Sequence, residues 1–197
     1  MFTLANGIQM SSLGLGTWKL NGQTCETAVY DAIKVGYRAI DTAQAYGNEA
    51  EVGKAISRAI KDGLVTRKDL FIATKLSFEN DAGYAQVQAL VQKQLQLLQT
   101  EYLDLYYLHS AQKNDEITRT TWKGLEVLHQ QGTIRSLGLS NHNSEQLRHH
   151  FKVIGPEAVA PMVLQNKFDV YHPGILRCII VAYRQVCILF ICNYGSC

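Results

Sequence analysis

Short apolar segments alternate with longer amphipathic segments along most of the chain. The short segments lack strict alternation of polar and apolar residues, which indicates strands that are buried on both faces. The longer segments repeat apolar residues at helical spacing, most clearly over Ala85–Gln99. This order predicts parallel strands joined by helical crossovers. The predicted strands are Leu13–Gly16, Tyr37–Asp41, Leu70–Lys75, Leu103–His109, Ile134–Ser140 and Met162–Phe168.

The predicted helices have recognisable ends. Four of them stop at a glycine, which suits the left-handed conformation of a helix C-cap. Asn48 precedes Glu51 by three residues, a spacing typical of a capping box at the start of a helix. The predicted helices are Thr24–Val35, 48–63, Ala85–Gln99, Arg119–Gln131 and Ser144–Ile154.

Ahead of the first strand–helix unit, Phe2–Met10 centres on Asn6-Gly7. An Asn-Gly pair is the strongest short signal for a β-hairpin, because both residues tolerate the positive φ that the tight turn requires. We therefore expect a small N-terminal β-hairpin that covers the N-terminal end of the sheet.

Polar residues end the predicted strands at regular intervals. Asp41, Lys75 and His109 lie 34 residues apart and then 34 again, and Ser140 and Gln165 end the two strands that follow. A polar residue at the C-terminal end of each parallel strand is how a β/α barrel builds its active-site face. An open doubly wound sheet usually shows G-x-G-x-x-G after its first strand, and this chain lacks the third glycine there. The predicted fold class is therefore α/β, of the (β/α)8 TIM-barrel type.

Composition narrows the function classes. The chain has 197 residues, 47% hydrophobic and 18% charged, which is ordinary for one globular domain. The net charge of +2 comes from scattered basic residues, so we expect no nucleic-acid or membrane partner. The N-terminus lacks the pattern of a secretory signal, which favours a cytoplasmic protein. Four of the five cysteines fall in the last 20 residues without a C-x-x-C pair, so we expect free thiols and no metal site.

Four of the polar residues form a chemical set if the strands are parallel neighbours. A buried Lys75 needs a charged partner, which Asp41 supplies. The Lys75 ammonium is expected to lower the pKa of Tyr46, so that its phenol donates a proton near neutral pH. His109 is expected to orient and polarise a carbonyl group. Each residue alone is more often a capping or half-buried residue, and their shared period carries the prediction. Side chains do not donate hydride, so a nicotinamide cofactor is implied.

The runs that carry these residues resemble the aldo-keto reductase superfamily over about residues 3–174. The resemblance implies a (β/α)8 barrel that reduces aldehydes and ketones with NADPH, usually as a monomer and without metal. Two runs are highly specific to this superfamily, Arg38–Glu49 and the Gly-Leu-Ser-Asn run at 138–141. The other matching runs are Gly14–Trp18, Thr74–Leu76, Leu103–His109 and Gln165-Asn166.

The resemblance also implies a role for each matching residue. Tyr46 would be the general acid, tuned by Lys75 and Asp41, and His109 would orient the substrate. The residues expected to bind the cofactor are Gly16, Thr17, Trp18, Asp41, Ser140, Asn141 and Gln165, of which the last three would hydrogen-bond the nicotinamide carboxamide. Trp18, Tyr46 and His109 would form the substrate pocket.

The chain departs from the superfamily after about residue 174. Members continue through two more β/α units and hold the adenosine phosphate after the eighth strand. We therefore expect an incomplete barrel of about six β/α units in residues 1–174, followed by a divergent tail rich in cysteine and isoleucine in residues 175–197. An open arc leaves two sheet edges. The tail is expected to pair with an edge, and the chain to be a monomer that can self-associate through its edges.

Three functions remain open at this point. The first is an NADPH-dependent reductase of small carbonyl compounds with Tyr46 as proton donor. The second is a catalytically inactive, truncated relative with an interaction or regulatory role. The third, a hydrolase or isomerase on a β/α barrel, needs paired carboxylates or metal ligands at the strand ends, and the sequence shows neither. We expect His149 and His150 to face solvent without a role.

Overall fold

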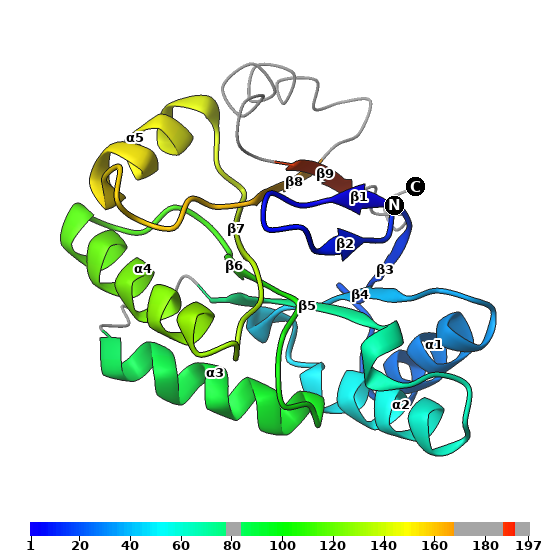
Figure 1. Cartoon of the computed structure of the whole chain (residues 1–197). Coiled ribbons are helices and arrows are strands. Elements are labelled where there is room, and N and C mark those ends of the chain that lie inside the picture. The colour runs from blue at the N-terminus through cyan, green and yellow to red at the C-terminus, as the bar shows by residue number, and fades with distance from the viewer. Residues whose placement is uncertain (78–83, 168–186, 192–197) are drawn as a thin grey trace.

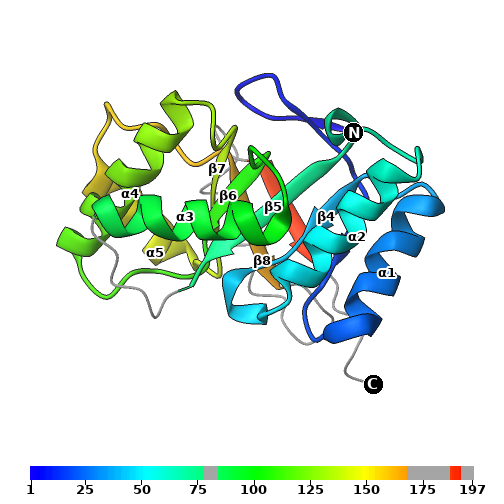
Figure 2. The ribbon, with the colours of Figure 1, turned by 90° about the horizontal axis from the view of Figure 1, so that it is seen from below.

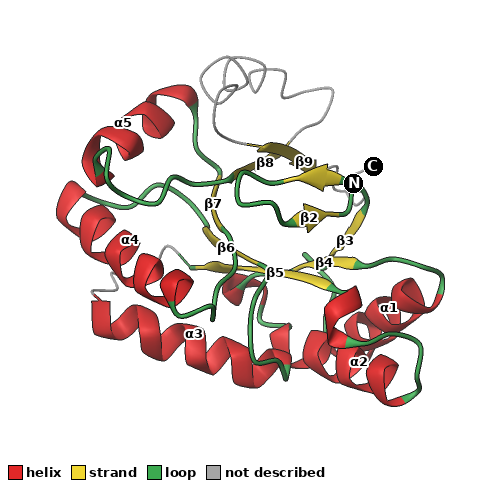
Figure 3. Cartoon of the chain, in the orientation of Figure 1, coloured by secondary structure: helices red, strands yellow, loops and turns green. Residues whose placement is uncertain are grey.

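The computed structural model describes residues 1–77, 84–167 and 187–191 (Figure 1). A parallel sheet in chain order, β3 to β9, curls through the centre of the molecule (Figure 3). Its first six strands confirm the six strands predicted from the sequence, and the curl confirms the incomplete barrel. Their bounds are β3 Gly14–Gly16, β4 Ala39–Asp41, β5 Phe71–Leu76, β6 Leu105–Leu108, β7 Leu137–Ser140 and β8 Val163–Lys167.

The helices lie on the outer face of the curled sheet (Figures 1 and 2). Each follows one strand and packs beside the next helix along the chain, as helical crossovers between parallel strands require. Gly36 and Gly63 follow the first two helices with φ of 109° and 73°, which confirms the predicted left-handed ends. The helices are α1 Gly22–Lys34, α2 Glu49–Lys61, α3 Tyr84–Leu98, α4 Asp115–Gln130 and α5 Ser144–Ile154, with short 3-10 turns η1 Gln44–Tyr46 and η2 Arg67–Asp69.

The predicted capping role of Asn48 is wrong. Asn48 precedes α2, but its side chain makes no hydrogen bond to the first turn of that helix. Its amide instead donates to the backbone oxygens of Thr17 and Leu20, over 2.8 and 2.9 Å, and accepts from Thr42 Oγ1 over 2.8 Å. Asn48 is buried, and the loop carbonyls beside it have no strand partner, so its amide satisfies them. Asn48 therefore fixes the loop after β3 against the loop after β4.

The N-terminal hairpin covers the N-terminal end of the sheet, as predicted. Its strands β1, Phe2–Thr3, and β2, Gln9–Met10, pair antiparallel. Leu4 and Met10 pack in one buried cluster with residues at the starts of several strands of the large sheet. Asn6 Nδ2 also donates to the backbone oxygen of Arg135 over 2.9 Å. The opposite, C-terminal end of the sheet is left for the site.

The main core lies between the sheet and the helices. Strand β5 is buried along its whole length, and Ile72 and Leu76 face the helices together with Val91 and Leu98 of α3. Helices α2 and α3 approach so closely that a Cβ atom at Gly53 would overlap the backbone of Leu98. This packing holds the ends of β4 and β5, which carry the charged residues of the site, in a fixed relation.

Strand β9, Cys187–Ile191, adds to the sheet beside β8. The two strands pair in parallel, with Val163 opposite Cys187 and Lys167 opposite Ile191. The expectation that the tail pairs with a sheet edge is confirmed for this segment. Within the described residues no pairing joins β9 to β3, and no helix there is long and apolar enough to cross a membrane. The rest of the predicted tail lies outside the described residues.

Candidate active site

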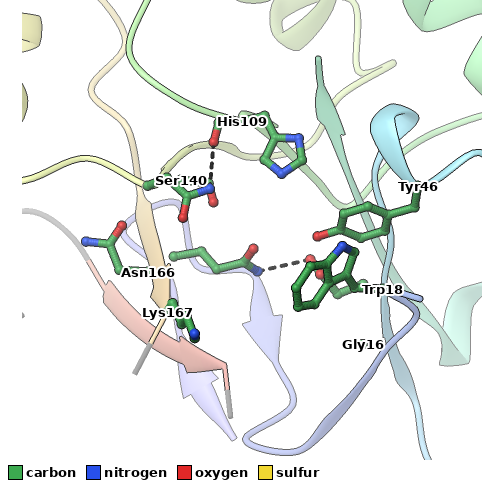
Figure 4. Close-up of a pocket in the computed structure, with 10 residues that line it drawn as sticks. Gly16, Trp18, Tyr46, His109, Ser140, Asn166 and Lys167 are labelled. Carbon is green, nitrogen blue, oxygen red and sulfur yellow. Dashed lines mark hydrogen bonds between the residues drawn. The ribbon is translucent and has the colours of Figure 1, made fainter. Parts of the chain in front are cut away.

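A pocket opens at the C-terminal ends of the strands, on the side away from the hairpin (Figure 4). Eight of the ten predicted site residues line it. Thr17 and Lys75 are buried and do not line it. The lining residues are Gly16, Trp18, Asp41, Tyr46, His109, Ser140, Asn141, Gln165, Asn166 and Lys167. The polar strand ends predicted from the sequence therefore share one mouth, and the role of each remains to be argued.

Lys75 lies beneath the pocket with 1% of its surface exposed. Its ammonium donates to Asp41 Oδ2 over 2.7 Å, to the backbone oxygen of Thr42 over 2.9 Å and to Tyr46 Oη over 3.3 Å. An ammonium has three hydrogens, so these three acceptors satisfy it completely. The predicted pairing of Lys75 with Asp41, and the contact with Tyr46, are both present in the structure.

The predicted lowering of the Tyr46 pKa is wrong for this structure. Burial raises the pKa of Tyr46 above its ordinary value of 10.0, and the opposing effect of the nearby Lys75 ammonium is smaller. The contact with Lys75 exists, but desolvation of the phenolate outweighs it. Tyr46 therefore holds its proton at neutral pH, and Lys75 is placed to stabilise negative charge on Oη as that proton leaves.

His109 stands beside Tyr46 in an edge-to-face arrangement, with ring centroids 5.7 Å apart (Figure 4). Burial lowers the pKa of His109 to about 4, and the Lys75 ammonium acts in the same direction. The imidazole is therefore neutral at pH 7. A neutral ring can donate one hydrogen bond, but it is a poor source of a proton.

Asp41 accepts hydrogen bonds on both carboxylate oxygens. Oδ1 accepts from Gln165 Nε2 over 3.0 Å, and Oδ2 accepts from Lys75. Thr17 supports Asp41 from behind, because its backbone N–H and its hydroxyl both donate to the Asp41 backbone oxygen, over 3.0 and 3.2 Å. In this structure the Thr17 side chain therefore holds the β3 loop on β4.

Asn141 has an unusual backbone, with φ of 54°. Its Nδ2 donates to the backbone oxygen of His109 over 2.9 Å, and its N–H donates to the Gln165 oxygen over 3.0 Å. Asparagine tolerates the left-handed conformation better than other residues with a Cβ atom, and such conformations gather at functional sites. Asn141 therefore joins the ends of β6, β7 and β8 at the mouth.

The sequence analysis gave no role to Asn166, which clamps the residue after Asn141. The Asn166 side chain accepts from the His142 N–H over 3.1 Å and donates to the His142 oxygen over 2.8 Å. This two-point contact fixes the segment that leaves β7. The signal available in the sequence was the neighbouring amide pair Gln165-Asn166, read only as part of the resemblance.

A second buried polar group was also missed. Glu49 Oε1 accepts from Thr74 Oγ1 over 2.6 Å and from Gln94 Nε2 over 2.8 Å, and Gln94 Nε2 also lies 3.3 Å from the Lys75 oxygen. Burial raises the pKa of Glu49. The group braces the end of β5 from the helix side. A glutamine within the apolar face of α3 was the sequence signal for it.

The prediction for His150 is wrong. His150 is 3% exposed and packs edge-to-face on Trp122, with ring centroids 4.7 Å apart. Burial lowers its pKa to about 3. The face of α5 that carries it turns toward α4, so the histidine fills the contact between the two helices. His149 faces solvent as predicted, with Nε2 2.7 Å from Asp115 Oδ1.

Comparison with known proteins identifies the family. The model of the "Aldo/keto reductase family" matches residues 12–179. An NADPH-dependent D-xylose reductase of Candida boidinii is 34% identical over 220 residues, covering 100% of this chain and 66% of that protein. A glyoxal reductase of Bacillus subtilis is 40% identical over 175 residues, covering 88% of this chain and 59% of that protein.

Solved structures agree with the sequence comparison. An aldo-keto reductase of Bombyx mori, in complex with NADP, superposes with a TM-score of 0.81 at 30% identity, covering 96% of this chain and 64% of that one. One from Brucella melitensis gives a TM-score of 0.84, also at 30% identity, covering 95% and 70%. The chain spans less than two thirds of the length of both curated relatives named above. The chain belongs to the aldo/keto reductase family.

Proposed function

We propose that this chain reduces aldehydes and ketones to alcohols with NADPH, and that Tyr46 donates the proton. The observation that carries the proposal is the position of Lys75 Nζ, 2.7 Å from Asp41 Oδ2 and 3.3 Å from Tyr46 Oη. The relatives support it, since their names describe NADPH-dependent reductases of D-xylose and, in one case, of glyoxal.

The wall of the pocket suits a nicotinamide. A carboxamide has one strong acceptor and two donors, and Ser140, Asn141 and Gln165 bring hydroxyl and amide groups of both kinds to the pocket. These three residues would hold the carboxamide, and Trp18 would form an apolar wall beside it. When bound, NADPH supplies the hydride that no side chain can give.

Proton transfer then depends on Tyr46. Its raised pKa keeps the phenol protonated at neutral pH, so the proton is present when a carbonyl oxygen arrives. As the carbonyl oxygen gains negative charge it takes the proton from Oη, and Lys75 stabilises the phenolate that remains. Lys75 interacts more strongly with the phenolate than with the phenol, so it lowers the barrier to this step.

His109 has a different task. With a pKa of about 4 the imidazole is neutral at pH 7, so it acts as a hydrogen-bond donor to the carbonyl oxygen and not as the acid. Its T-shaped contact with Tyr46 places both rings on one side of the pocket (Figure 4). Together the two residues would orient the carbonyl for the hydride and supply its proton.

Two measurements on the same protein test the proposal. Titration with NADPH, followed by protein fluorescence, should show saturable binding, and a simple aromatic aldehyde should then drive oxidation of NADPH. A chain that binds no NADPH would favour the alternative of an inactive relative with an interaction or regulatory role. The boundary near residue 174, the monomeric state and the cytoplasmic location stay predictions.

A further inference from the structure

Lys167 is the last residue of β8 and lines the same pocket as Tyr46 and His109 (Figure 4). Its side chain is exposed, whereas the four residues before it in β8 are buried. Alternate residues of a strand point to the same side, so Lys167 shares its side with Gln165, which reaches Asp41. At about 3.3 Å per residue, Lys167 begins about 7 Å beyond Gln165 in the direction of the mouth.

The charges of the pocket favour an anion at this position. The Asp41 carboxylate is matched by the Lys75 ammonium beneath it, over 2.7 Å. His109 is neutral at pH 7, because its pKa is lowered to about 4. The other polar side chains of the lining are hydroxyls and amides. Among the described residues that line the pocket or lie directly beneath it, Lys167 therefore leaves a formal charge of +1.

We propose that Lys167 is an anion-binding residue at the rim, which selects carbonyl substrates that also carry a carboxylate or a phosphate. This proposal rests on the reductase function proposed above. β8 and the turn that carries Tyr46 lie on opposite sides of the pocket, so the anionic group must be several bonds away from the carbonyl carbon (Figure 4). An ω-carboxylated or phosphorylated aldehyde fits this spacing, and a 2-oxo acid does not.

A pair of aldehydes of similar size tests the proposal. 4-Carboxybenzaldehyde carries the anion, and 4-nitrobenzaldehyde is of similar shape without a net charge. Lys167→Gln should raise the KM for the carboxylate about fivefold, the upper range for a partly exposed ion pair, and leave the KM for the nitro compound unchanged. Lys167→Glu should raise the carboxylate KM further. The difference between the two aldehydes should shrink in high salt.

The matched control is Lys68→Gln. Lys68 is an exposed lysine in η2, which precedes β5 and so lies toward the opposite end of the sheet. This variant should change neither KM. Equal KM changes for both aldehydes in Lys167→Gln, or no change for either, would overturn the proposal.

The diphosphate of NADPH is the other anion that could reach Lys167. Titration of wild type and Lys167→Gln with NADPH separates the two sources. An unchanged NADPH Kd is expected. A weaker NADPH Kd together with an unchanged aldehyde preference would assign Lys167 to the cofactor and overturn the substrate assignment.

Binding without turnover separates this proposal from the reductase function. 4-(Hydroxymethyl)benzoate and benzyl alcohol are the product-like probes, titrated into the chain and followed by NMR. Lys167→Gln should weaken binding of the benzoate about fivefold and leave binding of the alcohol unchanged. If neither aldehyde is turned over, the reductase function fails, while this titration still decides whether Lys167 binds the anion. Equal benzoate affinity in both proteins would count against it.

Discussion

Gln165 Nε2 donates a hydrogen bond to Asp41 Oδ1 over 3.0 Å, and this bond joins β8 to β4 across the pocket (Figure 4). The other oxygen of Asp41 accepts from Lys75, which in turn contacts Tyr46. One carboxylate thus connects the residue proposed to hold the nicotinamide with the proposed proton donor. Asp41 would therefore set the position of both groups.

The pair of Asp41 and Lys75 should show strong energetic coupling. Asp41→Asn leaves a buried ammonium without its carboxylate and should lower the free energy of unfolding by about 3 kcal/mol. The double variant with Lys75→Met should lose less than the sum of the two single variants, with a coupling of about 1–3 kcal/mol. Urea unfolding of the four proteins measures this.

The exposed pair of Arg58 and Asp62, 3.7 Å apart, is the control cycle. Its coupling should stay below about 0.5 kcal/mol, because water and salt screen a surface pair on a helix. Additive losses in the Asp41–Lys75 cycle would show that the ion pair is not the stabilising contact described above.

The backbone of Asn141 allows a test of local strain. Asn141→Ala and Asn141→Gly both remove the hydrogen bond to the His109 oxygen, so they differ only in how well they accept φ of 54°. The glycine variant should be more stable than the alanine variant by about 1 kcal/mol, because alanine pays the steric cost of the left-handed region. Thermal unfolding compares the two. An alanine variant as stable as the glycine variant would contradict the strained geometry.

The burial of His150 predicts a pH dependence of stability. Its pKa falls from 6.5 in an unfolded chain to about 3 in the fold, so the folded state requires the neutral ring. This contribution is complete above pH 6.5 and is lost as the pH falls from there toward 3. His150→Phe keeps an aromatic ring against Trp122 and removes the titration. The variant should therefore lose less stability than wild type between pH 7 and pH 5, by urea unfolding.

His149→Gln is the control, because His149 lies on the same helix and is exposed. It should follow wild type over the same pH range. If His150→Phe also lost as much stability as wild type, other groups would account for the acid sensitivity.

The sequence predicted the sheet and the site for a simple physical reason. Parallel strands bring their C-terminal ends to one edge, so residues spaced by one β/α unit, such as Asp41, Lys75 and His109, must meet. The order of apolar and polar positions was therefore enough to place them. Which helix face is buried is decided by the neighbouring helix, and this is why the exposure of His150 was predicted wrongly.

The remaining differences arise from competing local interactions. Asn48 has the residue type of a cap, but buried carbonyls of Thr17 and Leu20 compete for its amide and win. For Tyr46, the sequence showed the lysine that lowers the pKa but not the depth of burial that raises it. Contacts between distant amides, such as Asn166 with His142, leave no periodic signal in the sequence.

The most direct test of the account compares Tyr46→Phe with wild type. The phenylalanine ring keeps the packing against His109 but has no proton to give. NADPH should bind both proteins with the same Kd, whereas kcat for a simple aromatic aldehyde should fall by about 10²–10⁴ in the variant. Tyr84→Phe, at an exposed tyrosine at the start of α3, should match wild type. A Tyr46→Phe protein that turns over the aldehyde as fast as wild type would contradict the role of Tyr46 as proton donor.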